Sequence, residues 1–284
     1  MKAMDWYHLN MEKFEALINV REELHQAVQL VGMVGRSFLP PDPSDLSATS
    51  QWLNQSQSLG GSLITGNHQV RLALRIVDAS LMFLDSNGQV IDQFPLANEY
   101  YPDVVQWVSS KLADEGLDIS KFSQELPYQI PDYDHSRPFS AFPDHYLAEF
   151  SGYFSNANNL MAEIQSQYQS SEIVCWPHHF DIATLITVAA DPDPEKAKTV
   201  GLGLSPGDTY YNRPYFYINT WPHLSKKQLQ NETWSSAGTW HTRDWIGAVL
   251  PADKVITWES EEQQYAKVKM FLCEGVEKLQ KLLA

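Results

Sequence analysis

The chain has 284 residues and a formal net charge of -15, from 20 Lys and Arg against 35 Asp and Glu, so it repels a phosphate backbone; nucleic acid is not an expected partner. No apolar run approaches the roughly 20 residues of a membrane-spanning helix, and the N-terminal segment lacks the apolar core of a secretory signal. The only two cysteines, Cys175 and Cys273, cannot form a disulfide framework. We therefore expect a cytoplasmic protein that does not associate with membranes, and the sequence leaves its oligomeric state open.

The first 117 residues predict a helix, a set of strands and a second helix. From Leu9 to about Arg36, apolar residues recur at helical spacing, and a proline-rich run ends the pattern. The next segments alternate apolar with polar residues, and Asn87-Gly88 is a hairpin turn signal between two of them. Residues 100–116 regain helical periodicity and end on Gly116, which suits the C-terminus of a helix.

The second part of the chain repeats this succession after an irregular connection. Residues 118–143 contain four prolines and predict that connection, which separates the halves 1–117 and 144–284. The second half predicts a helix from residue 144, strands rich in β-branched and aromatic residues, and a closing helix over 260–283. We expect one α+β unit over residues 1–284, with antiparallel sheet flanked by amphipathic helices and two related halves as a possible subdivision.

The stretch CWPHHFDIATLI, residues 175–186, places two histidines and an aspartate in an apolar run. In an extended strand His179 and Asp181 project to one side, and His178 lies on the other. Such a pair can bind a divalent metal, or the carboxylate can orient the imidazole as a general base, so His179 and Asp181 are the catalytic candidates. The alternative is structural: Asp181 accepts a hydrogen bond within the fold, and His178 packs as a core aromatic.

Tryptophan beside histidine recurs twice more, in TWPHL at residues 220–224 and TWHTRD at residues 239–244. Strand ends with this pairing can bring the histidines together at one rim. Zinc, manganese and iron accept mixtures of imidazole and carboxylate, although the spacing here matches no common ligand motif. The expected metal ligands are His178, His179, Asp181, His223 and His241.

Two neighbouring stretches add detail to this half. GLGLSPGD, residues 201–208, does not match a phosphate-binding glycine loop; Pro206-Gly207 instead predicts a type II turn with φ > 0 at Gly207. RPYFYINTWP, residues 213–222, alternates Tyr215, Tyr217 and Asn219 with apolar residues. One face of this strand therefore presents phenol hydroxyls and an amide, either to a polar ligand or to solvent.

The favoured function is binding of a small polar ligand in an aromatic and histidine-rich cleft, with metal-assisted or acid–base hydrolysis as the accompanying chemistry. The alternatives are a non-catalytic module whose indoles stack on a sugar or another flat ligand, and a protein that meets a partner chain through aromatic side chains. The expected ligand-binding residues are Trp176, His178, Asp208, Tyr217, Trp221 and Trp240.

Taken in order, these stretches resemble a bacterial family of proteins of unknown function. The resemblance is most specific over about residues 172–222 and depends on the motifs W-P-H-H-F-D, residues 176–181, and G-L-S-P-G-D, residues 203–208. The family brings no established activity, so the resemblance implies a kind of protein and assigns no catalytic residue.

Overall fold

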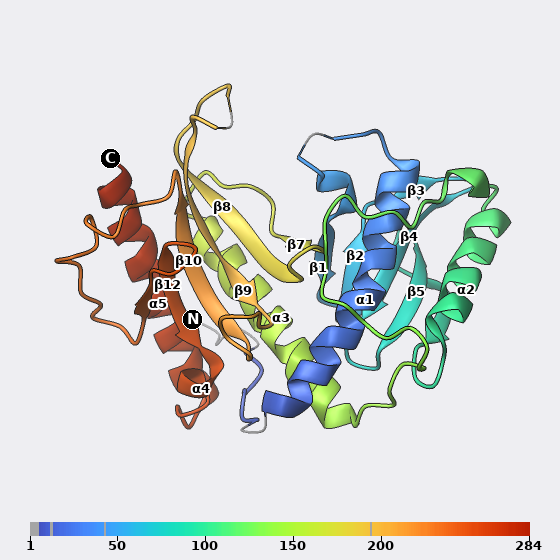
Figure 1. Cartoon of the computed structure of the whole chain (residues 1–284), viewed down its shortest axis with the longest axis horizontal. Helices are drawn as coiled ribbons and strands as arrows, with labels where there is room; N and C mark the ends of the chain where they lie inside the picture. Colours follow the sequence, from blue (N-terminus) through green and yellow to red (C-terminus); the bar gives the residue numbers. More distant parts are fainter. Residues whose placement is uncertain (1–5, 12–13, 43, 194) are drawn as a thin grey trace. The chain divides into compact units, whose positions relative to one another are not determined.

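The computed structural model describes residues 6–11, 14–42, 44–193 and 195–284, which divide into two compact units (Figure 1). Unit 1 comprises the described parts of Met1–Glu15, Gly152–Ile173 and Asp181–Ala284, and unit 2 comprises those of Ala16–Ser151 and Val174–Phe180. Antiparallel strands and helices make up both units, so the expected α+β class is confirmed. Residues 118–143 lie within unit 2, and their expected role as a connection between halves stays a prediction.

Unit 2 contains a sheet in the order β7-β1-β2-β4-β5-β6, with β3 on the side of β4. The Asn87-Gly88 hairpin signal is confirmed: Gly88 has φ 80° between β5 and β6, and the Asp85 carboxylate accepts the Asn87 backbone N–H at 2.8 Å. The strands are β1 (Ser50–Leu53), β2 (Ser58–Gly61), β3 (Ile64–Thr65), β4 (Gln69–Arg75), β5 (Ser80–Asp85), β6 (Val90–Pro95) and β7 (Val174–Trp176).

Two long helices accompany this sheet, α1 (Phe14–Phe38) and α2 (Tyr101–Asp114), with the 3-10 turns η1 (Leu46–Ala48) and η2 (Ile119–Lys121). Helix α1 is buried on nearly all sides from residue 23 onward, including polar residues that a surface helix would expose. Its Val31 lies so near β2 that a Cβ on Gly61 would approach it to 2.9 Å. Burial of these polar side chains requires partners, which the site described below provides.

Unit 1 contains a sheet in the order β11-β12-β10-β9-β8. Its helices are the part of α3 (Asp144–Gln165) from residue 152 onward, α4 (Ala252–Val255) and α5 (Glu261–Leu283). The strands are β8 (Asp181–Ala189), β9 (Lys198–Ser205), β10 (Tyr215–Trp221), β11 (Thr239–His241) and β12 (Gly247–Pro251).

One face of the unit 1 sheet belongs to the hydrophobic core. Val200, Leu202 and Ile218 are completely buried on it, and a Cβ on Gly275 of α5 would lie 2.8 Å from Ile218. Trp6 stacks on Phe216 of the same face, with ring centroids 6.4 Å apart. Helix α5 therefore covers this side of the sheet.

The opposite face, which we call the polar face, carries the residues that alternate with this core set. Directly paired residues share a face, and the register pairs Gly201 with both Leu185 and Asn219, and Thr199 with Trp221. The face thus presents the side chains of Asp181, Leu185, Thr199, Tyr217, Asn219, Trp221 and His241.

Two glycines of β9 shape the middle of the polar face. A Cβ on Gly203 would lie 2.8 Å from the ring of Tyr217, and a Cβ on Gly201 would lie 2.5 Å from the Asn219 side-chain oxygen. The side chains of Tyr217 and Asn219 in β10 therefore cover the two positions at which β9 has glycine. The alternating glycines of the GLGL stretch serve side-chain packing within a strand, in agreement with its rejection as a phosphate loop.

No helix in the described parts of the chain has the length and apolar character to cross a membrane.

Candidate functional site

The two adjacent histidines lie in a turn of unit 2, not in a strand. Strand β7 ends at Trp176, residues 177–180 form the turn, and Phe180 adopts φ 57°. The extended strand expected through residues 175–186 is therefore wrong at this point, because left-handed backbone interrupts side-chain alternation. The His178 and His179 rings, expected on opposite faces, lie side by side with centroids 4.2 Å apart.

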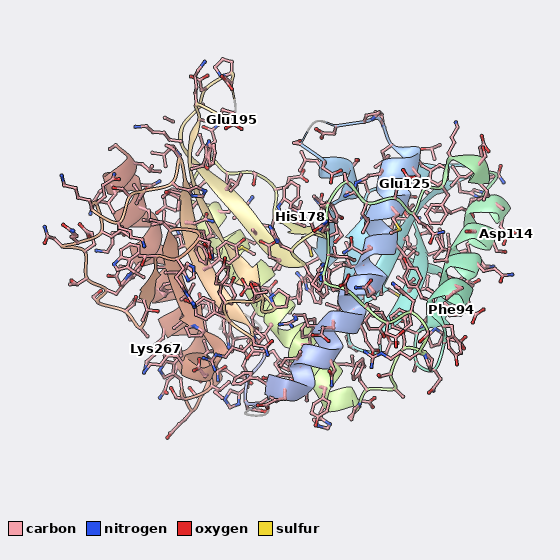
Figure 2. The ribbon with its side chains drawn as sticks, viewed as in Figure 1. Phe94, Asp114, Glu125, His178, Glu195 and Lys267 are labelled. Atoms are coloured by element: carbon pink, nitrogen blue, oxygen red, sulfur yellow. The ribbon has the colours of Figure 1, made fainter. Side chains whose placement is uncertain are left out.

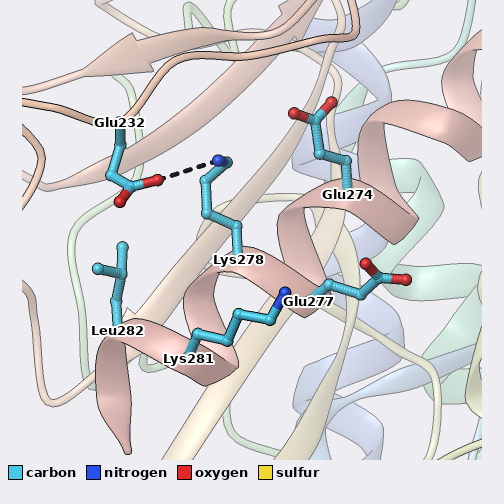
Figure 3. Close-up of a pocket in the computed structure, with 6 residues that line it drawn as sticks. All are labelled: Glu232, Glu274, Glu277, Lys278, Lys281 and Leu282. Carbon is cyan, nitrogen blue, oxygen red and sulfur yellow. Dashed lines mark hydrogen bonds and ion pairs between the residues drawn. The ribbon is translucent and has the colours of Figure 1, made fainter.

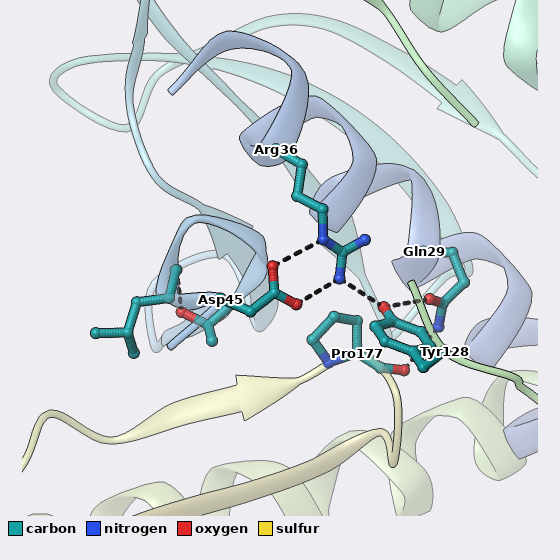
Figure 4. Close-up of polar contacts among 7 residues, drawn as sticks. Gln29, Arg36, Asp45, Tyr128 and Pro177 are labelled. Carbon is teal, nitrogen blue, oxygen red and sulfur yellow. Dashed lines mark hydrogen bonds and ion pairs between the residues drawn. The ribbon is translucent and has the colours of Figure 1, made fainter. Parts of the chain in front are cut away.

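Helix α1 anchors this turn through its buried polar residues (Figure 4). The carbonyl of Pro177 accepts two hydrogen bonds, from His25 Nε2 and from Gln29 Nε2, both at 2.7 Å. Gln29 and Pro177 are labelled in Figure 4. The His25 ring also stacks on Phe180, with centroids 5.4 Å apart and an interplanar angle of 11°. The buried polar residues of α1 thus have partners in the turn that carries His178 and His179.

A chain of side-chain hydrogen bonds extends from this anchor. Tyr128 donates its hydroxyl proton to Gln29 Oε1 at 3.0 Å and accepts a hydrogen bond from Arg36 Nη2 at 3.0 Å. Arg36 also forms a bidentate pair with Asp45, at 2.8 and 2.7 Å (Figure 4). Burial opposes the charge of Arg36, but these bonds outweigh it and raise the pKa of the guanidinium.

Burial keeps His25 and His178 neutral at neutral pH. It lowers the pKa of His25 to about 4, a direction that the nearby Arg21, His178 and His179 reinforce against the bond to Pro177. Burial, with a smaller effect of His179, also lowers the pKa of His178 to about 4. A neutral His25 that donates from Nε2 has an unprotonated Nδ1. His179 is exposed.

On the polar face of unit 1, carboxylates accept hydrogen bonds from tyrosines. Tyr217 of β10 donates its hydroxyl proton to Asp181 at the start of β8. Asp208, in the loop after β9, accepts from the Tyr215 hydroxyl at 2.7 Å and from the Tyr210 backbone N–H at 2.7 Å. Burial, followed by the bond to Asp208, raises the pKa of Tyr215, which therefore stays protonated at neutral pH.

The expected left-handed conformation of Gly207 is confirmed, with φ 116°. The connection is longer than the two-residue turn we expected, because β9 ends at Ser205 and β10 begins only at Tyr215. The Asp208 backbone N–H bonds to the Tyr211 carbonyl at 2.9 Å, and this bond folds the loop back upon itself.

His241 of β11 lies in an aromatic box in unit 1. Its ring stacks on Trp245, with centroids 4.2 Å apart, and its Nδ1 lies 2.9 Å from the Tyr211 hydroxyl. The residue is 3% exposed, and its Nε2 has no hydrogen-bond partner in the described part of the chain. Burial, with a contribution from Arg243, lowers the pKa of His241.

A groove of about 480 Å³ lies in unit 1 at the end of the polar face. Trp221 is 38% exposed there, and its indole Nε1 donates to the Glu195 carbonyl at 3.2 Å. The His223 ring stands edge-on to this indole, with centroids 5.4 Å apart. Glu195 comes from the hairpin between β8 and β9 (Figure 2). The groove is lined by Leu185, Glu195, Ala197, Thr199, Asn219, Thr220, Trp221 and His223.

Trp240 does not share a face with the other expected ligand-binding residues of unit 1. It pairs with Ala248, whose neighbour in β10 is the core residue Ile218. Its Nε1 donates to the Glu232 carbonyl at 2.9 Å, and its ring lies 4.9 Å from Trp234. The strand alternation that places His241 on the polar face directs the preceding tryptophan to the other side.

A second cavity, of about 310 Å³, lies against α5 (Figure 3). It is lined by Glu232, Glu274, Glu277, Lys278, Lys281 and Leu282. Lys278 pairs with Glu232 at 3.0 Å, and Glu274 accepts two backbone N–H bonds at 2.8 Å, from residues 235 and 236. Glu232, Lys278 and Glu274 therefore have partners within the fold, and the lining contains no aromatic side chain for stacking.

The expected site residues thus fall into several groups. Trp176, His178 and His179 belong to unit 2, and the remaining ones to unit 1. Within residues 6–11, 14–42, 44–193 and 195–284, no group of three or more His, Cys, Asp and Glu side chains could hold a metal ion. The expectation of a zinc, manganese or iron site therefore gains no support from the described residues.

Sequence reasoning missed the groove's Thr199 and Glu195 and the anchoring pair His25 and Gln29. The two glycines at alternate positions of β9 were an available signal for the groove, because glycines on one strand face indicate close approach of a neighbouring side chain. No comparable signal marked His25 and Gln29, since a polar residue within a helix ordinarily faces solvent.

Comparison with known proteins yields a family but no activity. No curated protein and no solved structure matches the chain. One family model, described as a family of unknown function (DUF5996), matches residues 6–274. Since the match covers nearly the entire chain, the protein belongs to this family of unknown function.

Proposed function

We propose that the chain binds a small polar ligand in the groove that contains Trp221 and His223. The observation that carries the proposal is this groove, whose volume of about 480 Å³ falls within the range of about 300–1,000 Å³ for small-molecule sites. The sequence predicted Trp221 as a ligand-binding residue and His223 as a metal ligand. The proposal retains the favoured interpretation of the sequence and places the ligand at one end of the polar face.

The chemistry of the lining supports a ligand with several hydrogen-bonding groups. The side chains of Thr199, Asn219 and His223 make no hydrogen bond to another residue in the described part of the chain. A hydroxyl, an amide and an imidazole offer donors and acceptors of both kinds. Beside them, the partly exposed Trp221 ring provides an apolar surface, a combination that suits polar ligands with one flat side.

A ligand screen with matched variants tests this function. Purified protein is melted by differential scanning fluorimetry in the presence of sugars, amino acids, nucleotides, polyamines and inorganic phosphate. At least one compound should raise the melting temperature of the wild type and of Lys278→Ala, which alters only the cavity on α5. The same compound should have no effect on Trp221→Ala. Equal responses of all three proteins, or none, would contradict the proposal.

A second candidate function is acid–base chemistry on the polar face, and the buried Nε2 of His241 favours it. A buried imidazole nitrogen without a partner costs about 1–3 kcal/mol, a cost that a bound reactant group would offset. Asp181, on the same face of unit 1, stays the predicted residue for proton transfer, whereas the prediction for His179 concerns unit 2. In an assay with p-nitrophenyl esters, phosphates and glycosides, wild-type turnover should fall at least tenfold in His241→Gln. Absence of wild-type turnover on the whole panel would remove this candidate.

A further inference from the structure

We propose that the ligand of the Trp221 groove is a saccharide that stacks one face of its ring on the indole. This inference rests on the proposed function and adds the chemical class. Stacking requires an accessible ring held in one orientation. Trp221 meets both conditions, because it is 38% exposed while its Nε1 donates to the Glu195 carbonyl and its ring packs nearly perpendicular to that of His223.

The strand register places polar groups beside this ring. Thr199 is the direct cross-strand partner of Trp221, and Asn219 precedes it by two residues on the same face of β10. Neighbouring hydroxyls of a sugar donate and accept at once, as do a threonine hydroxyl and an amide. A stacked sugar would therefore find partners along one edge while its apolar C–H face covers the indole.

Leu185 and Asn219 line the groove and are the cross-strand neighbours of Gly201. Gly201 lies between the other two in the sheet, and a Cβ there would approach the Asn219 side-chain oxygen to 2.5 Å and Leu185 to 3.3 Å. The missing side chain thus permits the present position of the amide, which lies over Gly201. Leu185 itself is 46% exposed, which extends the apolar part of the surface.

Charge distinguishes a neutral saccharide from other polar ligands. Glu195 supplies the one carboxylate of the lining, which contains no lysine or arginine. The two lysines nearest in sequence are engaged elsewhere, Lys196 with Asp193 at 3.0 Å and Lys198 with the Leu283 carbonyl. An anionic ligand, such as a phosphate, a nucleotide or a carboxylate, would be repelled by Glu195 and would find no cationic side chain in the lining. A cation remains compatible with one indole and one carboxylate, and the test below separates it.

Titration with defined probes tests the saccharide class. Glucose, galactose, mannose, N-acetylglucosamine and their β-1,4- and α-1,4-linked disaccharides are added to wild-type protein, with isothermal calorimetry as the readout. Spermidine, choline and inorganic phosphate serve as non-saccharide probes. At least one saccharide should bind, and Trp221→Ala should weaken its binding at least tenfold. Trp221→Phe, which keeps a ring, should stay within a few-fold of wild type.

Two further variants connect the binding to the geometry. Asn219→Ala should weaken saccharide binding several-fold, and Gly201→Ala should do the same because its Cβ displaces the amide. Lys278→Ala should bind as wild type does. Thermal melting of each unliganded variant shows whether it is folded, and the exposed Trp221→Ala provides the decisive comparison if Gly201→Ala does not fold.

The outcomes distinguish failure of the saccharide proposal from failure of the small-ligand proposal on which it rests. Binding of spermidine, choline or phosphate that depends on Trp221, without any saccharide binding, would overturn the saccharide class and leave the small-ligand proposal intact. Saccharide binding that Trp221→Ala leaves unchanged would overturn this inference as well. If none of the probes binds and the wider screen also finds no Trp221-dependent ligand, both proposals fail.

Discussion

Acidification should destabilise unit 2 because the buried His25 ring resists protonation. The size of the effect follows from how far burial lowers the pKa of His25. The pKa of His25 is lowered from 6.5 to about 4 in the folded chain. Between pH 6.5 and pH 4, His25 is therefore mostly protonated in the unfolded chain and mostly neutral in the folded chain. The stability that the neutral, buried His25 contributes is complete above pH 6.5 and is lost as the pH falls toward 4. Linkage gives a loss of about 2 kcal/mol between pH 7.5 and pH 5.

The comparison that isolates His25 uses His25→Gln, which does not titrate but can still donate an amide N–H to the Pro177 carbonyl. The free energy of unfolding in urea is measured by circular dichroism at several pH values for both proteins. Carboxylates and His178 titrate in both, so only the difference matters. Between pH 7.5 and pH 5 the wild type should lose about 2 kcal/mol more than the variant.

A direct measurement of the His25 pKa tests the same prediction. Heteronuclear NMR of the histidine rings should show one resonance that is absent from His25→Gln and that titrates near pH 4. A midpoint near the ordinary value of 6.5, or equal pH dependence of stability in the two proteins, would refute the argument that burial keeps this imidazole neutral.

Three further substitutions test the packing around the candidate sites, each by urea denaturation. Gly203→Ala should cost about 1–3 kcal/mol, because its Cβ would lie 2.6 Å from the Ile182 carbonyl oxygen; a cost below about 0.5 kcal/mol would contradict this close packing. Gly207→Ala should cost about 1–3 kcal/mol, since φ 116° is strained for alanine, and unchanged stability would mean that the loop relaxes freely. Gln29→Leu should cost about 1–3 kcal/mol by removing partners of Tyr128 and Pro177. The isosteric Gln29→Glu should cost at least as much, because it buries a carboxylate that faces the Pro177 carbonyl in place of an N–H donor.

Sequence reasoning succeeded where a local pattern had a local cause. The alternation in residues 213–221 correctly placed Tyr217 and Asn219 on one face, with Phe216 and Ile218 in the core, because successive side chains of any strand point to opposite sides. The positive φ at Gly207 was likewise predictable, since few other residues tolerate that conformation.

The same reasoning failed at residues 177–180, where the cause lies far along the chain. No local signal in the His-His-Phe triplet predicts the left-handed backbone conformation of Phe180. That conformation is accompanied by hydrogen bonds from His25 and Gln29 to Pro177, about 150 residues away, and by the stacking of His25 on Phe180. Such contacts can override local preference because their combined free energy exceeds the cost of one strained residue.

Periodicity and turn chemistry act within a few residues, so the amino-acid pattern was enough to predict the α+β class, the main helices, the exclusion of a phosphate loop and the polar face of β10. Which of these elements are neighbours became known from the three-dimensional structure. In that structure Gly201 pairs with Asn219 and Thr199 pairs with Trp221 across neighbouring strands. Trp240 lies on the face opposite to that of His241. Strand register and long-range hydrogen bonds set these relations, and a pattern within one segment carries no information about its partner's register.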